Sequence, residues 1–190
     1  MLNRLFGSLL LASAAAIAQT TPSAPGAASR SGAGRAGFVV LNCVSISKEL
    51  QQFGAGSIET GTLDCVRQAR YDDAARLFLL AGIDARFDDD RAADPGADDG
   101  ARTLTRLVSE ALTPAQMAEL VRTTHDLMTT DESHRSLCAT IRRIGPPDVV
   151  ARHATSSAPA ARTPGQRLAR NVDADREWAT LTRAYLDCPA

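Results

Sequence analysis

Three histidines and several carboxylates are the first side chains in this sequence whose chemistry could define a site. His125 is followed by Asp126, and His134 comes shortly after Asp131 and Glu132. Imidazole and carboxylate groups together can bind a divalent metal. No His-Glu-x-x-His motif is present, and these residues flank a connection between two predicted helices, where solvated polar side chains are common. We therefore expect no metal site, and we keep His125 and His134 as candidates for an alternative catalytic role.

Glu59 is the other candidate for a catalytic residue. With Thr60 and Gly61 after it at the start of a predicted helix, it resembles the catalytic glutamate of exported cell-wall lytic enzymes with helical folds. The resemblance implies wall-lytic activity with Glu59 as its catalytic residue. The glycine-rich continuation of that family's signature is missing here, and an acid in the first turn also complements the helix dipole. Catalysis by Glu59 therefore stands as an alternative interpretation.

An aspartate-rich stretch between residues 84 and 100 suggests a calcium site, because hard cations prefer carboxylate oxygens. Its spacing does not fit an EF-hand, since Ala92 falls where a ligand oxygen is required, and Arg86 and Arg91 would repel a cation. We expect a solvated acidic surface loop. The chain also has no Gly-x-Ser-x-Gly nucleophile motif and no phosphate-binding loop, and nothing in it implies a cofactor.

Residues 1–18 have the layout of a cleavable signal peptide. Arg4 precedes a mostly apolar run from Leu5 to Ile17, and a small-x-small cleavage site ends at Ala18. The apolar run is shorter than the roughly 20 residues needed to span a bilayer. We expect cleavage near Ala18 and a periplasmic or secreted protein without a membrane span.

Composition narrows the range of partners. From Gln19 onward the chain has 20 basic and 22 acidic residues, a net charge of −2. This balance gives no basic excess for nucleic acid or anionic lipid. Residues 19–37 are rich in Ala, Ser, Gly and Pro, which predicts a flexible lead-in. We expect one domain over residues 38–190, with an irregular loop at about 146–172.

The four cysteines, Cys43, Cys65, Cys138 and Cys188, all follow the predicted signal peptide. An even count in an exported chain is typical of disulfides, because oxidising compartments allow them to persist. Four cysteines allow three pairings, and the sequence does not decide among them. We favour Cys43 with Cys65 and Cys138 with Cys188, since the first pair would join neighbouring helices and the second would fix the C-terminus. Metal binding is disfavoured because no Cys-x-x-Cys spacing occurs.

Apolar residues recur with the period of an α-helix along most of the chain. The pattern predicts an all-α domain of six or seven helices arranged as antiparallel hairpins. The predicted helical segments are 39–53, whose β-branched start is also compatible with a strand, 57–70, 72–81, 104–111, 114–128, 131–144 and 178–188.

One predicted hairpin, at about residues 57–86, resembles a single tetratricopeptide or Sel1-like repeat. Tyr71, Ala74, Phe78 and Ala81 have the spacing of the second helix of such a repeat. The resemblance implies a scaffold that binds another protein. No second copy occurs at a period near 34 or 36, although solenoids usually need at least three repeats. A helical hairpin that shares only the packing of these repeats is the alternative.

We therefore expect an exported helical protein-binding module: an assembly partner, an inhibitor or an immunity-type protein. Two alternatives remain open. One is a periplasmic enzyme of hydrolase type that uses Glu59, His125 or His134, and the other is a passive structural protein of the envelope. The sequence indicates neither the partner nor the oligomeric state.

Overall fold

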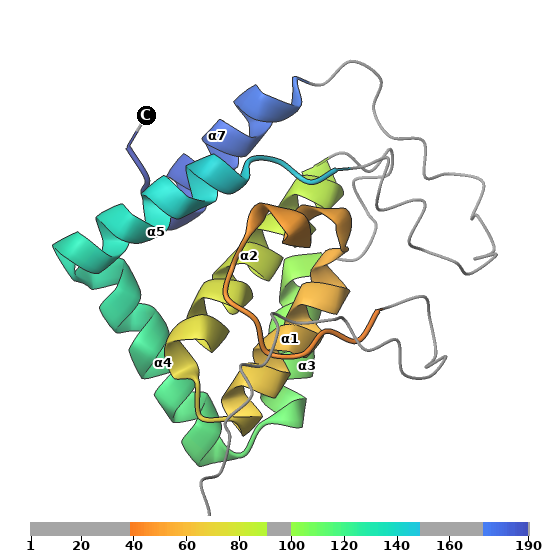
Figure 1. Ribbon diagram of the computed structural model, residues 1–190, viewed down its shortest axis with the longest axis vertical. Helices are drawn as coiled ribbons and strands as arrows, with labels where there is room; N and C mark the ends of the chain where they lie inside the picture. Colours follow the sequence, from red (N-terminus) through yellow and green to blue (C-terminus); the bar gives the residue numbers. More distant parts are fainter. Residues whose placement is uncertain (1–38, 91–99, 149–172, 190) are drawn as a thin grey trace, which may run out of the picture.

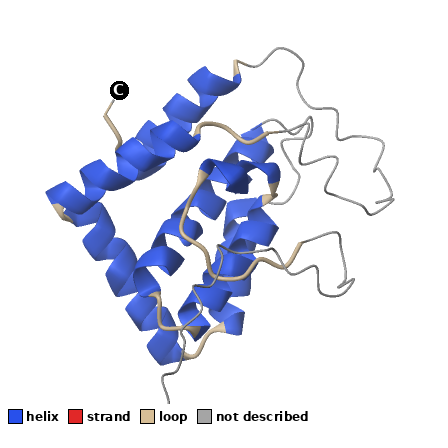
Figure 2. Cartoon of the chain, in the orientation of Figure 1, coloured by secondary structure: helices blue, strands red, loops and turns tan. Residues whose placement is uncertain are grey.

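The computed structural model describes residues 39–90, 100–148 and 173–189 (Figure 1). Within these ranges the chain forms six α-helices, one short 3-10 helix and no strand (Figure 2), so the predicted all-α class is confirmed. The elements are η1 (Lys48–Gln52), α1 (Ala55–Arg67), α2 (Tyr71–Asp90), α3 (Gly100–Ala111), α4 (Pro114–Thr129), α5 (Asp131–Ile144) and α7 (Ala174–Leu186). The predicted signal peptide, the lead-in and most of the predicted loop at 146–172 lie outside the described residues.

Helix α2 is the centre of the fold and packs against α1, α3, α4 and α7 (Figure 1). Leu77, Leu80 and Phe87 on this helix have no exposed surface. Burying a side chain of this size stabilises a fold by roughly 1.5–3 kcal/mol. The acidic loop predicted between residues 84 and 100 was wrong over residues 84–90, because α2 continues to Asp90 and buries Asp84 as well as Phe87. Residues 91–99 of that prediction lie outside the described residues. Ile83 and Phe87 are four residues apart and both are buried, so the apolar face of α2 continues through its acidic residues.

The first described segment, residues 39–46, is extended, so the helix predicted over 39–53 was wrong except for the short η1. It crosses α1 as an extended chain (Figure 1). Its alternate N–H groups point to the same side and meet oxygens spaced by three and four residues on one face of α1. The N–H of Val39 donates to Ser57 Oγ (3.0 Å), that of Leu41 to Thr60 Oγ1 (2.8 Å) and that of Cys43 to Asp64 Oδ2 (2.8 Å). These side-chain acceptors replace the hydrogen bonds that a helix would have provided.

Helix α4 begins as the sequence predicts. Thr113 Oγ1 accepts from the N–H of Gln116 while the Gln116 side chain accepts from the N–H of Thr113, which forms a capping box with Pro114 in the first turn. Two large side chains that continue the apolar spacing of their helices are nevertheless on the surface: Val121 on α4 is 58% exposed and Tyr185 on α7 is 46% exposed.

Two disulfides connect these elements. Cys43–Cys65 joins the extended segment to α1, and Cys138–Cys188 joins α5 to the chain after α7. These are the pairs that we favoured from the sequence. Across the described part of the chain, the helices are too short or too polar to cross a membrane.

Candidate functional site

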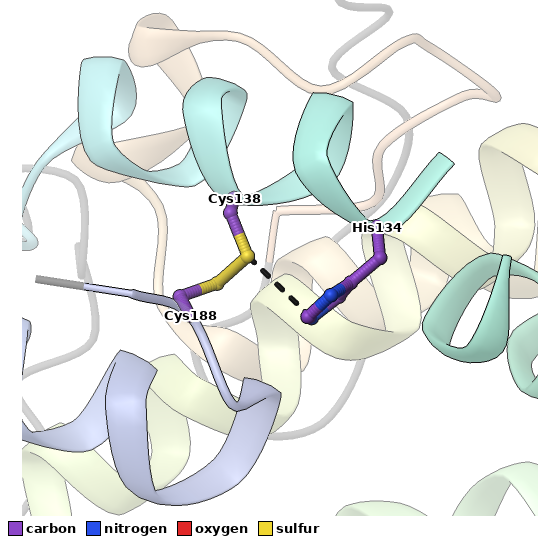
Figure 3. Close-up of side chains that lie close together, drawn as sticks. All are labelled: His134, Cys138 and Cys188. Carbon is purple, nitrogen blue, oxygen red and sulfur yellow. Dashed lines mark hydrogen bonds between the residues drawn. A yellow bond between two sulfur atoms is a disulfide. The ribbon is translucent and has the colours of Figure 1, made fainter. Parts of the chain in front are cut away.

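His134, Cys138 and Cys188 form the one group in the described part of the chain whose side-chain atoms are close enough to share a metal ion. Their potential ligand atoms lie within 4.8 Å of one another. His134 and Cys138 are one helical turn apart on α5, and the imidazole points toward the disulfide (Figure 3). His134 Nε2 lies 3.5 Å from Cys138 Sγ. Both cysteines are buried and the histidine is half-buried.

The end of α7 directs Cys188 toward this cluster. Asp187 adopts a left-handed conformation with φ of 52°, which ends the helix. The N–H of Cys188 then donates back to the carbonyl of Thr182 at 3.4 Å. Trp178 holds α7 against α5 through a hydrogen bond from Nε1 to the Ile141 carbonyl. The disulfide is therefore placed by a helix terminus that is itself fixed to α5.

His134 also contacts the last turn of α7. Its Nε2 lies 2.5 Å from the carbonyl oxygen of Leu186. Because a carbonyl only accepts, Nε2 is the protonated ring nitrogen in this arrangement. In the disulfide state the sulfurs are not thiolates, and this cluster serves to fasten α7 to α5.

Among the described residues, neither His125 nor any of the carboxylates considered from the sequence belongs to this group. His125 is exposed on α4, whereas His134 faces the disulfide. The sequence contained a signal for this cluster that we missed: His134 and Cys138 are four residues apart, which places them on one helix face.

A second feature is a hollow of about 540 Å³ between the end of α2 and the outer face of α3. Three arginines lie along it, together with two hydroxyl side chains: its lining residues are Arg86, Ala101, Arg102, Thr105, Arg106 and Ser109. Arg106 has an acidic partner in Glu110 at 3.6 Å, but both side chains are more than 60% exposed. Such exposed pairs contribute at most about 1 kcal/mol and are easily exchanged for another carboxylate.

Arg86 connects this hollow to α7. Its guanidinium carbon lies 3.8 Å from the centre of the Tyr185 ring, a cation–π contact. The ring orients the planar guanidinium and leaves its N–H groups to bind at their edges. Although Tyr185 fits the apolar spacing of α7, it is exposed and forms part of this arginine-rich surface.

Glu59 is the third candidate, and it is only 5% exposed. Burial raises its pKa from the ordinary 4.5 to about 7. Its Oε2 has no hydrogen-bond partner among the described residues. A buried carboxyl that holds its proton near neutral pH is what general acid catalysis requires, but at 5% exposure Glu59 has little access to a substrate.

The residues that suggested a repeat lie on α2 in the hairpin with α1. Ala74 and Ala81 are buried, and Tyr71 and Phe78 are half-buried. Gly61 on α1 sits where a Cβ would come within 3.4 Å of the Asn42 carbonyl and 3.5 Å of Leu77. These are ordinary van der Waals distances, so the packing of α1 at this position does not require a glycine.

Comparison of this chain with protein-family models, with curated proteins and with solved structures finds no match.

Proposed function

We propose that this protein is an exported helical module that binds another protein, and that the partner places carboxylates in the arginine-lined hollow between α2 and α3. The observation that carries this proposal is the convergence of Arg86, Arg102 and Arg106 on one open hollow. Guanidinium groups bind carboxylates through two parallel hydrogen bonds, which gives both affinity and orientation. A chain with a net charge of −1 has no general excess of cations, so the grouping of three arginines is local.

The surroundings of the hollow support a protein partner. Tyrosine and arginine are the residue types enriched at the centres of protein interfaces. Here Tyr185 is 46% exposed beneath Arg86, and Leu107, which follows Arg106 on α3, is 42% exposed. A partner could therefore bury apolar surface around the ion pairs, which strengthens them by excluding water.

Export is the second part of the proposal. It is supported by the signal-like residues 1–18 and by two disulfides, which persist in oxidising compartments. The resemblance of residues 57–86 to a tetratricopeptide or Sel1-like hairpin also favours a protein-binding role, since such hairpins serve as scaffolds.

Affinity capture from the envelope fraction of the native cell tests the proposal with three immobilised baits. The first is the unchanged chain, and the second carries Arg86→Gln, Arg102→Gln and Arg106→Gln. The third is a matched control in which the same charge is removed from exposed arginines of α5: Arg135→Gln, Arg142→Gln and Arg143→Gln. We expect one protein to be recovered at stoichiometry by the first and third baits and not by the second. Equal recovery by all three would contradict the assigned surface, and no stoichiometric partner would contradict the function.

A hydrolase that uses Glu59 is the second candidate, because a buried carboxyl with a pKa of about 7 has the protonation state of a general acid. Clearing of a suspension of purified cell wall measures this activity. Clearing that is abolished by Glu59→Gln would favour the enzyme, whereas no clearing by the unchanged chain would exclude wall-lytic activity.

A further inference from the structure

We propose that the Cys138–Cys188 disulfide is the oxidised form of a metal site, and that after reduction its two thiolates and the His134 imidazole bind one zinc-like ion. The three side chains converge from α5 and from the end of α7 (Figure 3). This inference rests on their geometry and is independent of the proposed protein partner.

The donor set selects the kind of metal. Two thiolates and one imidazole are the ligands typical of Zn²⁺, which binds sulfur at about 2.3 Å and nitrogen at about 2.0 Å. The potential ligand atoms lie within 4.8 Å of one another, the two sulfurs because they are bonded. After reduction the sulfurs must separate to about 3.8 Å, the distance between two sulfur ligands of one tetrahedral ion. The 3.5 Å contact between His134 Nε2 and Cys138 Sγ is close to the ligand separation in such a site.

Reduction must come first. A dithiol donates two electrons and two protons, the bond between the two sulfurs breaks, and the dithiol leaves as its own disulfide. Zn²⁺ then displaces one proton from each thiol and binds the two thiolates. His134 must release the proton from Nε2 and carry one on Nδ1, because a lone pair on Nε2 is needed for coordination.

Water is the fourth ligand. The carbonyl of Leu186 lies 2.5 Å from His134 Nε2 and accepts that nitrogen's proton in the disulfide state. This separation is too short for two ligands of one tetrahedral ion, which would lie about 3.3 Å apart at metal–ligand distances of about 2.0 Å. The imidazole must therefore turn away from this carbonyl to bind the ion, and a water molecule takes the fourth position.

The second disulfide provides an internal comparison. Cys43 and Cys65 are also joined, but in the described part of the chain no third ligand atom is grouped with them. Reduction there yields two thiols without an imidazole. Metal binding after reduction should therefore be specific to the Cys138–Cys188 pair. In the reduced chain the bound ion should take over the role of the disulfide and hold α7 against α5.

Cobalt titration tests the site. The purified chain carrying Cys43→Ser and Cys65→Ser is treated with a phosphine reductant and titrated with Co²⁺, a spectroscopic substitute for Zn²⁺. We expect one equivalent to bind, with a thiolate-to-cobalt charge-transfer band that Zn²⁺ abolishes and that the oxidised chain lacks. Cys138→Ser should halve the band, and His134→Ala should weaken binding at least tenfold. His125→Ala, an exposed histidine on the neighbouring helix, is the matched control and should change nothing.

The result that would overturn the proposal is a reduced chain, helical by circular dichroism, that binds no Co²⁺ with a charge-transfer band. Equal binding by the His134→Ala variant would overturn it as well. If the Cys43→Ser, Cys65→Ser chain fails to fold, the unchanged chain is reduced and compared with a Cys138→Ser, Cys188→Ser chain. The band must then appear in the former and be missing from the latter.

Discussion

Cys43 is anchored by Asp64, the residue immediately before its disulfide partner: its N–H donates to Asp64 Oδ2 at 2.8 Å. This hydrogen bond is the main reason that the pKa of Asp64 is lowered from its ordinary value. A hydrogen bond to a charged acceptor contributes more than one between neutral groups. The extended segment is thus attached to α1 by a disulfide and by a hydrogen bond to a charged carboxylate.

Asp64→Ala should therefore lower the free energy of unfolding by about 1–3 kcal/mol, because it leaves the Cys43 N–H without its acceptor. Arg67→Ala is the matched control, since it removes the ion pair with Asp64 but keeps this hydrogen bond. Arg67 is 61% exposed, so its loss should cost less than about 1 kcal/mol. Urea denaturation of both variants measures the difference, and equal losses would contradict the anchoring role of Asp64.

The two disulfides should differ in their contribution to stability. They close loops with sequence separations of 22 and 50 residues, for which the chain-entropy relation gives about 3.4 and 4.1 kcal/mol. Replacing Cys138 and Cys188 by serine should destabilise the chain slightly more than replacing Cys43 and Cys65. Denaturant midpoints check this order. Thiol titration of the unfolded, unreduced chain should find no free thiol, and four reactive thiols would refute both bonds.

Glu59 should make the protein less stable as the pH rises. Its folded pKa of about 7 exceeds the ordinary 4.5, so between these values the folded state holds a proton that the unfolded state has lost. The contribution of Glu59 to stability is therefore fully present below about pH 4.5 and is lost as the pH rises through about 7. At 1.36 kcal/mol for each pKa unit, the loss approaches about 3 kcal/mol.

Glu59→Gln should remove most of this pH dependence, and at pH 8 it should stabilise the fold relative to the unchanged chain. Urea denaturation at pH 4.5, 6 and 8 measures both effects. Glu132→Gln, at an exposed position of α5, is the control and should leave the pH dependence as it was. A Glu59→Gln chain with the original pH profile would show that another group is responsible.

Ala69 occupies a strained position in the turn between α1 and α2, with φ of 56°. A left-handed conformation costs a residue with a Cβ roughly 1–2 kcal/mol, whereas glycine adopts it freely. Ala69→Gly should therefore raise the melting temperature, by a gain of about 0.5–1 kcal/mol after the greater entropy of unfolded glycine is included. Ala139→Gly, at an exposed position within α5, should lower it. A lower melting temperature for Ala69→Gly would show that the turn is not strained.

Much of the fold was predictable because helical periodicity and capping are local. Thr113, Pro114 and Gln116 act together in the first turn of α4 as their types indicate. Residues 39–46 also have helical spacing, but their N–H groups find acceptors on α1, which no local pattern reveals.

The candidate site was less predictable, because it depends on contacts between distant elements. The contact of His134 with Leu186 spans 52 residues of sequence, and the ring of Tyr185 meets Arg86 from another helix. The spacing of His134 and Cys138 was visible in the sequence, but it indicates a cluster only when Cys188 is known to complete it. Tyr185 likewise fits a helical apolar stripe, and only tertiary packing shows that it is exposed.

Titration calorimetry with the captured partner tests most directly whether a protein binds through its carboxylates at Arg86, Arg102 and Arg106, as we propose. We expect Arg86→Gln alone to weaken binding at least tenfold and the replacement of all three arginines to weaken it further. Added salt should weaken binding to the unchanged chain. The control with three glutamines on α5 should bind within twofold of the unchanged chain. An unchanged Kd for the variant with Arg86, Arg102 and Arg106 all replaced by glutamine would show that the partner does not bind at these arginines.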